Sequence, residues 1–294
     1  MIGEFGVTLD IMSVFNGEQM QISRVYLDKP TIKILVNEEG KANYDIAKGD
    51  DEEVEDVEQD NSEPFAIKLD FWEITNGRIV YDDKTIPTTI VLNGFNHSGS
   101  GEIADVYDLY LNTSVDDLNV AFDGSTYYEH SKFDSDITLN LDLAKGKYTF
   151  KENVLKLNEF PFGFDGFVSM PSEDIDMDIK FETKATAFKN ILSVVPGMFM
   201  EGFDDIKTEG SLGFNGFVKG TFNETTMPGF FLNLLVKDAM FQYPDLPAAV
   251  KNIQVDLDID NIDANMDNIA IALKKFHLDL GSNPIDMNVA MNVL

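Results

Sequence analysis

Apolar and polar residues alternate along much of the chain, and the polar residue is often aspartate. Clear examples are residues 137–143 (ITLNLDL), 174–181 (DIDMDIKF) and 255–260 (VDLDID). Successive side chains of a β-strand point to opposite faces of the sheet, so each segment predicts a strand that is apolar on one face and acidic on the other. Many such strands joined by turns predict a long antiparallel sheet with one apolar face.

Proline, glycine and asparagine indicate where strands break or turn. A strand is expected on both sides of Pro30, interrupted there because proline lacks the N–H that a ladder needs. Asn76-Gly77 suits a two-residue type I′ turn, which predicts a hairpin. Residues 236–243 repeat the pattern of residues 74–81, which favours a sheet extended by hairpins. Further strands are expected at residues 86–96, 102–112, 115–123, 134–143, 146–150 and 153–157.

Two segments have the period of a short amphipathic helix. The first spans residues 186–195 and ends before Pro196-Gly197. The second spans residues 247–253, with Pro247 in its first turn. Both are too short and too few for parallel βαβ units, so we expect them to cap a sheet and the chain to be mainly β.

Composition narrows the classes of partner. The chain has 294 residues, 44% of them hydrophobic, which is typical of a folded protein. Its formal net charge of −30 repels nucleic acid and anionic membrane surfaces, so no nucleic-acid partner is expected. Cysteine is absent, which excludes disulfides and thiolate sites. Residues 47–64 form an acidic block that predicts a disordered loop, and a calcium site there would lack the spacing of an EF-hand.

Candidate catalytic residues are sparse. His97, His130 and His277 lie far apart in the sequence, and no glycine-flanked nucleophile accompanies them. The aspartates of residues 174–178 share one strand face and could bind calcium or do acid–base work, but a solvated outer face explains them more simply. The glycines of residues 210–220 lack the lysine of a phosphate loop. We therefore expect no enzyme activity, no metal and no cofactor.

Several segments together resemble the AsmA-like proteins of bacterial envelopes, in the form found in Bacteroidetes. No single motif is specific, and the resemblance lies in their order and spacing over most of the chain. The segments are residues 30–34 (PTIKI), 40–45 (GKANYD), 76–82 (NGRIVYD), 188–192 (FKNIL), 210–212 (GSL), 216–220 (GFVKG) and 243–247 (YPDLP).

The resemblance implies an elongated, curved antiparallel sheet, bent into a groove or taco-like shape with an apolar concave face. It implies a single AsmA-like segment over residues 1–294, located in the periplasm and involved in phospholipid transport and outer-membrane biogenesis. The family usually has tryptophan where this chain has Tyr44. It also carries an N-terminal inner-membrane anchor that is not evident here, so we expect the sequence to be a segment of a longer, tethered protein.

Three hypotheses follow for the apolar face and the sheet edges. The first is a segment that binds or conducts a phospholipid or another acyl-chain lipid. The second is a non-enzymatic structural or assembly module that binds envelope proteins through its sheet edges, and the third is a calcium-dependent adhesin. Under the first hypothesis the groove lining is predicted to be Ile137, Leu139, Leu141, Leu143, Phe160, Phe162, Phe164, Ile175, Met177, Ile179, Val255, Leu257 and Ile259.

Overall fold

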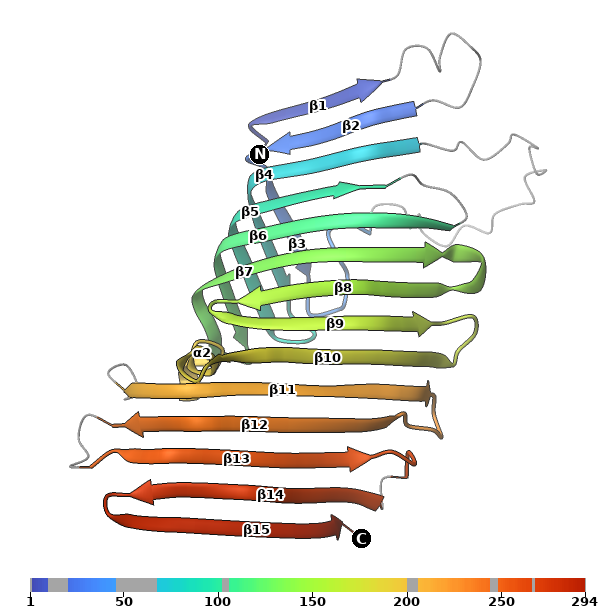
Figure 1. The fold of residues 1–294 in the computed structure, drawn as a ribbon. Helices are drawn as coiled ribbons and strands as arrows, with labels where there is room; N and C mark the ends of the chain where they lie inside the picture. Colours follow the sequence, from blue (N-terminus) through green and yellow to red (C-terminus); the bar gives the residue numbers. More distant parts are fainter. Residues whose placement is uncertain are drawn as a thin grey trace. The chain divides into compact units, whose positions relative to one another are not determined.

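The described residues fold mainly into β-strands (Figure 1). The computed structural model describes residues 2–9, 21–45, 68–101, 106–199, 206–243, 248–265 and 268–293. The strands are β1 (Glu4–Leu9), β2 (Gln21–Asp28), β3 (Thr31–Val36), β4 (Lys68–Asp83), β5 (Thr88–Ser100), β6 (Val106–Phe122), β7 (Ser125–Asp142), β8 (Lys147–Leu157), β9 (Phe160–Ser169), β10 (Ile175–Ala187), β11 (Lys207–Phe222), β12 (Gly229–Gln242), β13 (Val250–Asn261), β14 (Ile269–Leu280) and β15 (Asn283–Val293).

Hydrogen bonding links neighbouring strands almost entirely in chain order. The order is β1-β2-β4-β5 and onward to β15, and β3 also pairs with β4. The β2–β4 and β3–β4 pairs are parallel, whereas the other described pairs are antiparallel. The prediction of a mainly β protein built on one large antiparallel sheet is therefore confirmed, whereas its bending into a groove stays a prediction.

The chain divides into two compact units. The first comprises residues 1–103 and 111–133, and the second comprises residues 104–110 and 134–294. In the second unit, strands β8 to β15 lie side by side in chain order (Figure 1). The acidic block at residues 47–64 lies outside the described residues.

The break at Pro30 occurs as predicted. β2 and β3 lie end to end along the same strand, β4, with Pro30 between them. The carbonyl oxygen of Pro30 accepts a hydrogen bond from the N–H of Arg78 at 2.8 Å. Proline thus interrupts the ladder without leaving its own acceptor unpaired.

The predicted hairpin at Asn76-Gly77 is wrong. β4 continues through both residues, and its register with β5 shifts there, so Asn76 lies in a β-bulge. Asn76 does adopt the left-handed conformation, with φ of 47°, because a bulge can require positive φ just as a turn does. Asp238, its counterpart in the 236–243 repeat, has φ of 48° at a register shift within β12. The repeat is thus a repeat of bulges within long strands.

Bulges also explain why several strands are longer than predicted. The two strands expected over residues 146–157 form the single strand β8, which bulges at Glu152, with φ of 52°. β6 (Val106–Phe122) also covers both of the strands expected over residues 102–123. In three places an asparagine side-chain oxygen accepts a main-chain N–H near a residue with positive φ. That residue is itself the donor for Asn76 and His130, and in the third place it is Glu152, which precedes the acceptor Asn153. These bonds join Asn96 to the N–H of Asn76 (2.9 Å), Asn119 to that of His130 (3.1 Å) and Asn153 to that of Thr138 (2.6 Å).

The prediction of two short helices is only partly right. The first segment contains α2 (Lys189–Leu192), which is shorter than expected, followed by turns and the 3-10 turn η2 (Gly197–Phe199). The second prediction is wrong, because residues 250–253 belong to β13 and Pro247 lies outside the described residues. Val250 and Ile253 are buried on either side of a bulge at Asn252, which breaks the alternation and mimics a helical period.

Candidate functional site

One face of the second unit is apolar across seven strands. Directly paired residues of β9 to β15 share a face, so the register defines which side chains line up. One row runs Phe164, Phe181, Gly216, Leu232, Ile259, Ile271, Met291. A second row, over β11 to β15, runs Phe214, Leu234, Leu257, Leu273, Val289. We call the face that carries these two rows the apolar face.

The opposite face of the same strands is rich in charge, and we call it the acidic face. Asp178 pairs with Lys219 across β10 and β11 at 2.7 Å. Asp258 lies near Lys274 and accepts a hydrogen bond from Asn233 at 2.7 Å. Desolvation opposes the effect, but these two partners hold the pKa of Asp258 below its ordinary value. Lys274 and Asn233 thus stabilise Asp258 as an anion.

The protein's own side chains fill the apolar face at one end. Leu212, Val236, Ala239, Val250 and Ile253 form a buried cluster there. Phe188 and Ile191, from α2 and the residue before it, pack against this cluster. The helix therefore acts as the predicted cap, although it covers only the end of the face.

Away from that cluster the apolar face is only partly covered. The residues of its two rows over β9 to β14 are half-buried, except for Gly216, which is buried. On β15, Ile285, Met287, Val289 and Met291 are 45%, 47%, 38% and 51% exposed. An apolar ligand that covered these side chains would remove their surface from water, and this burial would favour binding.

Aromatic rings are concentrated on the first strands of the apolar face. The Phe162 ring lies 6.2 Å from that of Phe181 and 6.1 Å from that of Phe214, and Phe160 stacks on Phe214 at 6.0 Å. The Phe181 ring covers Gly216, where a Cβ atom would lie 2.6 Å from it. Glycine thus lets the ring lie flat against the neighbouring main chain.

The structure places most of the predicted lining together. The predicted residues of β9, β10 and β13 all lie on the apolar face, namely Phe160, Phe162, Phe164, Ile175, Met177, Ile179, Val255, Leu257 and Ile259. Ile137, Leu139 and Leu141 alternate along β7, and Leu141 is buried. Leu143 lies beyond β7 in the 3-10 turn η1 (Leu143–Lys145) and is 57% exposed.

The predicted groove lining did not include Phe181 and Phe214, although both belong to this aromatic group. Phe181 is the next apolar position after Ile179 in the alternation of β10, and that signal could have identified it. Phe214 lies in the glycine-rich segment, whose strand pattern is interrupted by glycines at apolar-face positions.

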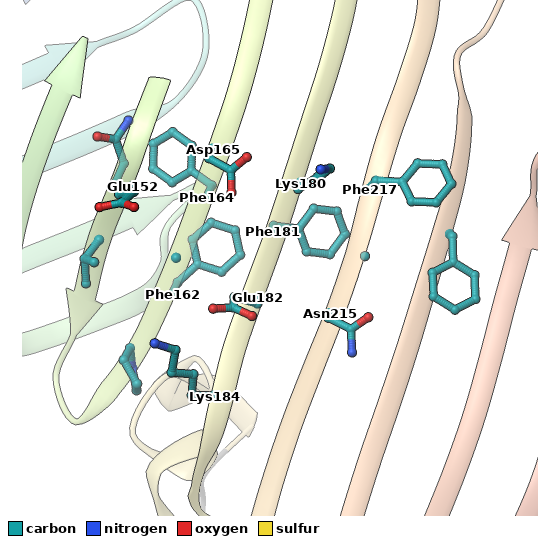
Figure 2. Close-up of a pocket in the computed structure, with 16 residues that line it drawn as sticks. Glu152, Phe162, Phe164, Asp165, Lys180, Phe181, Glu182, Lys184, Asn215 and Phe217 are labelled. Carbon is teal, nitrogen blue, oxygen red and sulfur yellow. The ribbon is translucent and has the colours of Figure 1, made fainter. Parts of the chain in front are cut away.

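A depression of about 1010 Å³ lies over β8 to β12 (Figure 2). It is bordered by residues of both faces, since Phe162, Phe164 and Phe181 alternate with charged residues. Asn153 and Gly216, which pair with Phe164 and Phe181 on the apolar face, also border it, whereas Ile179 and Phe214 do not. The acidic-face neighbours do, namely Val154, Gly163, Asp165, Lys180, Glu182, Asn215, Phe217 and Phe231. The depression thus includes two of the predicted lining residues, Phe162 and Phe164, together with charged side chains.

The histidines are engaged in separate places. His97 accepts a hydrogen bond from the Trp72 indole N–H at 3.1 Å, and its Nδ1 lies 3.0 Å from the Thr113 hydroxyl. His130 contacts Asp117 at 3.0 Å and His277 contacts Asp286 at 2.8 Å. No serine is hydrogen-bonded to them in the contacts described, and in the part of the chain that the structure describes no three metal-ligating side chains cluster.

The aspartate ladder of β10 has side-chain partners on the neighbouring strand and turn. Asp176 accepts a hydrogen bond from the Thr221 hydroxyl at 2.6 Å, and Asp174 accepts one from Asn223 at 3.0 Å. These contacts fit the solvated outer face that was expected of the ladder.

Within the described ranges, no helix is long and apolar enough to span a bilayer. Comparisons with family models, curated proteins and solved structures found no match to the chain.

Proposed function

We propose that the apolar face of the second unit binds the acyl chains of a lipid. The chain would then act as a lipid-binding or lipid-conducting segment of an AsmA-like envelope protein. Phospholipid is the proposed cargo, and a periplasmic location with attachment to the inner membrane belongs to the same proposal. We propose no chemical reaction: the protein would bind lipid and pass it on without catalysis.

One observation supports the proposal most directly. Two rows of paired apolar side chains extend across the strands, and among the described residues the buried cluster lies at the end under α2. At about 4.8 Å between strands, the row from Phe164 to Met291 extends roughly 29 Å. A bilayer's hydrocarbon core, two tails thick, is about 30 Å, so the row is long enough for a full acyl chain.

Binding of an acyl chain to the apolar face does not require a particular polar or charged side chain. Each methylene removed from water contributes about 0.8 kcal/mol, so a tail of ordinary length can bind without hydrogen bonds. The acidic face keeps the opposite side of the sheet hydrated and discourages stacking of sheets. The two faces together favour a hydrocarbon ligand over a polar one.

A charge on the apolar face tests the proposal. Leu257→Asp introduces a carboxylate in the middle of the second row, where an acyl chain would have to desolvate it. The matched control is Asn215→Asp, which adds the same charge on the exposed acidic face of β11. Purified proteins would be extracted and analysed for bound phospholipid by mass spectrometry, after circular dichroism has shown that both variants are folded.

We expect the unaltered chain and Asn215→Asp to retain phospholipid and Leu257→Asp to lose most of it. Equal lipid content in the two folded variants would contradict binding at the apolar face. Lipid-free protein that also fails to take up lipid from vesicles would contradict the proposed function itself.

A further inference from the structure

Several charged side chains around the depression over β8 to β12 have no ion-pair partner. They are Glu152, Asp165, Lys180, Glu182 and Lys184, and Figure 2 labels each of them. Among the contacts of the described residues, none of these five side chains forms an ion pair or a hydrogen bond. Their charges are therefore free to interact with a ligand.

A lysine on the next strand shows the contrast. Lys219 of β11 lies 2.7 Å from Asp178 of β10, its direct neighbour across the two strands. Lys180 forms no such pair, although Asp165 of β9 is its direct neighbour. Carboxylates are in large excess, with 52 acidic against 22 basic residues, so the unpaired lysine does not reflect a shortage of partners.

Charges of opposite sign alternate along β10 beside the depression. Lys180, Glu182 and Lys184 are exposed and occupy every second position, roughly 6.6 Å apart along the strand. Lys180 and Glu182 point to the acidic face, because Phe181 between them belongs to a row of the apolar face. A ligand at this strand thus meets a positive and a negative group close together.

Two phenylalanines on the same face provide an aromatic surface beside these charges. Phe217 is the direct neighbour of Lys180 on β11, and Phe231 is the direct neighbour of Phe217 on β12. Their ring centroids are 6.0 Å apart, and both residues border the depression. Both are half-buried, so part of each ring stays accessible. The face of an aromatic ring attracts an ammonium group.

The charges around the depression disfavour a ligand of a single sign. The net charge of −30 repels a simple anion, whereas the two lysines repel a simple cation. A zwitterion avoids both penalties, because its anionic group can contact a lysine while its cationic group contacts a carboxylate and a ring. The depression, at about 1010 Å³, is large enough for a small molecule of this kind.

We propose that the depression binds a phosphorylated amino alcohol, the class of zwitterion to which phosphoethanolamine belongs. The Lys180 ammonium group donates hydrogen bonds to the phosphate. The ligand's own ammonium group contacts the Glu182 carboxylate and the Phe217 ring. These contacts are on the acidic face, so the proposal does not depend on binding of acyl chains to the apolar face. A free compound and a lipid headgroup at a bilayer surface both present this chemistry.

Chemical-shift titrations of ¹⁵N-labelled protein test the site with phosphoethanolamine, inorganic phosphate and ethanolamine in separate experiments. We expect phosphoethanolamine to bind more tightly than either of the other two compounds. It should shift the amide signals of Gly163 and Gly216, which border the depression. No binding of phosphoethanolamine, equal affinity for one of its halves, or shifts confined to residues outside the depression would overturn the proposal.

Two substitutions separate the roles of the charged groups. Lys180→Gln should weaken phosphoethanolamine binding about two- to fivefold, without weakening the binding of ethanolamine. Glu182→Gln should weaken it by a similar factor, without weakening the binding of phosphate. Lys219→Gln is the matched control, because it makes the same charge change on an exposed residue of this face that does not border the depression. Equal affinities in Lys180→Gln and Lys219→Gln would also overturn the proposal.

Vesicle flotation distinguishes the two sources of the ligand. It would use Leu257→Asp, in which acyl chains should no longer bind to the apolar face. Flotation with phosphatidylcholine vesicles but not with phosphatidylglycerol vesicles would support the site and identify a lipid headgroup as its ligand. Binding of free phosphoethanolamine without flotation would support the site and identify a soluble ligand. Because Leu257→Asp should bind phosphoethanolamine as the unaltered chain does, a failure of this proposal is distinguishable from a failure of lipid binding.

Discussion

Replacing two leucines of the same face distinguishes the filled end from the open part. Leu212 is buried in the cluster under α2, whereas Leu257 is half-buried in the second row. Leu212→Ala removes three carbon atoms from a site that is enclosed on all sides. We expect it to lower the free energy of unfolding by about 2 to 4 kcal/mol, from lost transfer free energy and the cavity left behind.

Leu257→Ala removes the same atoms from a surface that is covered on one side only. No enclosed cavity is created, and part of the side chain already contacts water. We therefore expect a loss of about 1 kcal/mol or less in lipid-free protein, for which only the partial transfer term applies.

Urea unfolding followed by far-ultraviolet circular dichroism measures both changes. The free energy of unfolding should fall with urea concentration at the same slope in both variants and in the unaltered chain, so that the unfolding midpoints can be compared directly. Equal, large losses for the two leucines would refute the reasoning, because they would mean that the protein itself fills the row around Leu257. Added phospholipid should widen the difference between the unaltered chain and Leu257→Ala.

Two further predictions concern individual side chains. Burial lowers the pKa of His97 below its ordinary 6.5, so the folded state binds fewer protons than the unfolded state and stability should fall as the pH drops through 6.5. Urea unfolding at several pH values, followed by the fluorescence of Trp72, the one tryptophan, measures how the free energy of unfolding changes with pH. This change should be smaller in His97→Gln than in the unaltered chain. An identical change in the two proteins would contradict the prediction. Gly216→Ala should destabilise by about 1 to 3 kcal/mol, because its Cβ would lie 2.2 Å from the carbonyl oxygen of Phe231. Gly163→Ala, with its nearest neighbour at 3.5 Å, should be tolerated, and equal melting-temperature losses for the two glycines would contradict the packing argument.

The sequence predicts the strands of this protein better than it predicts their ends. Alternation over residues 174–181 and 255–260 identifies β10, β13 and the face that each presents. It cannot distinguish a turn from a bulge at Asn76-Gly77, because both require a residue that tolerates positive φ. The outcome depends on whether the neighbouring strand continues alongside, and that is a long-range property.

The same limit explains the false helix at residues 247–253. A bulge at Asn252 inserts one residue into the alternation, so Val250 and Ile253 fall three positions apart while both point into the core. Three-residue spacing is the signal used to identify a helix. The candidate face was largely recoverable because it depends on period-two alternation, whereas the closeness of Phe181 to Phe162 and Phe214 required knowledge of which strands are neighbours.

The bulges help to fix the register between these long strands, whose sequences are repetitive. A strand that simply alternates can slide by two residues against its neighbour and still bury the same kinds of side chain. Sliding β4 by two residues would move Asn76 away from the Asn96 amide oxygen and leave a left-handed residue in a regular ladder position. The hydrogen bond to Asn76 therefore favours one register of β4 over the registers shifted by two residues. Bonds of this kind allow a chain of similar strands to fold to a single structure.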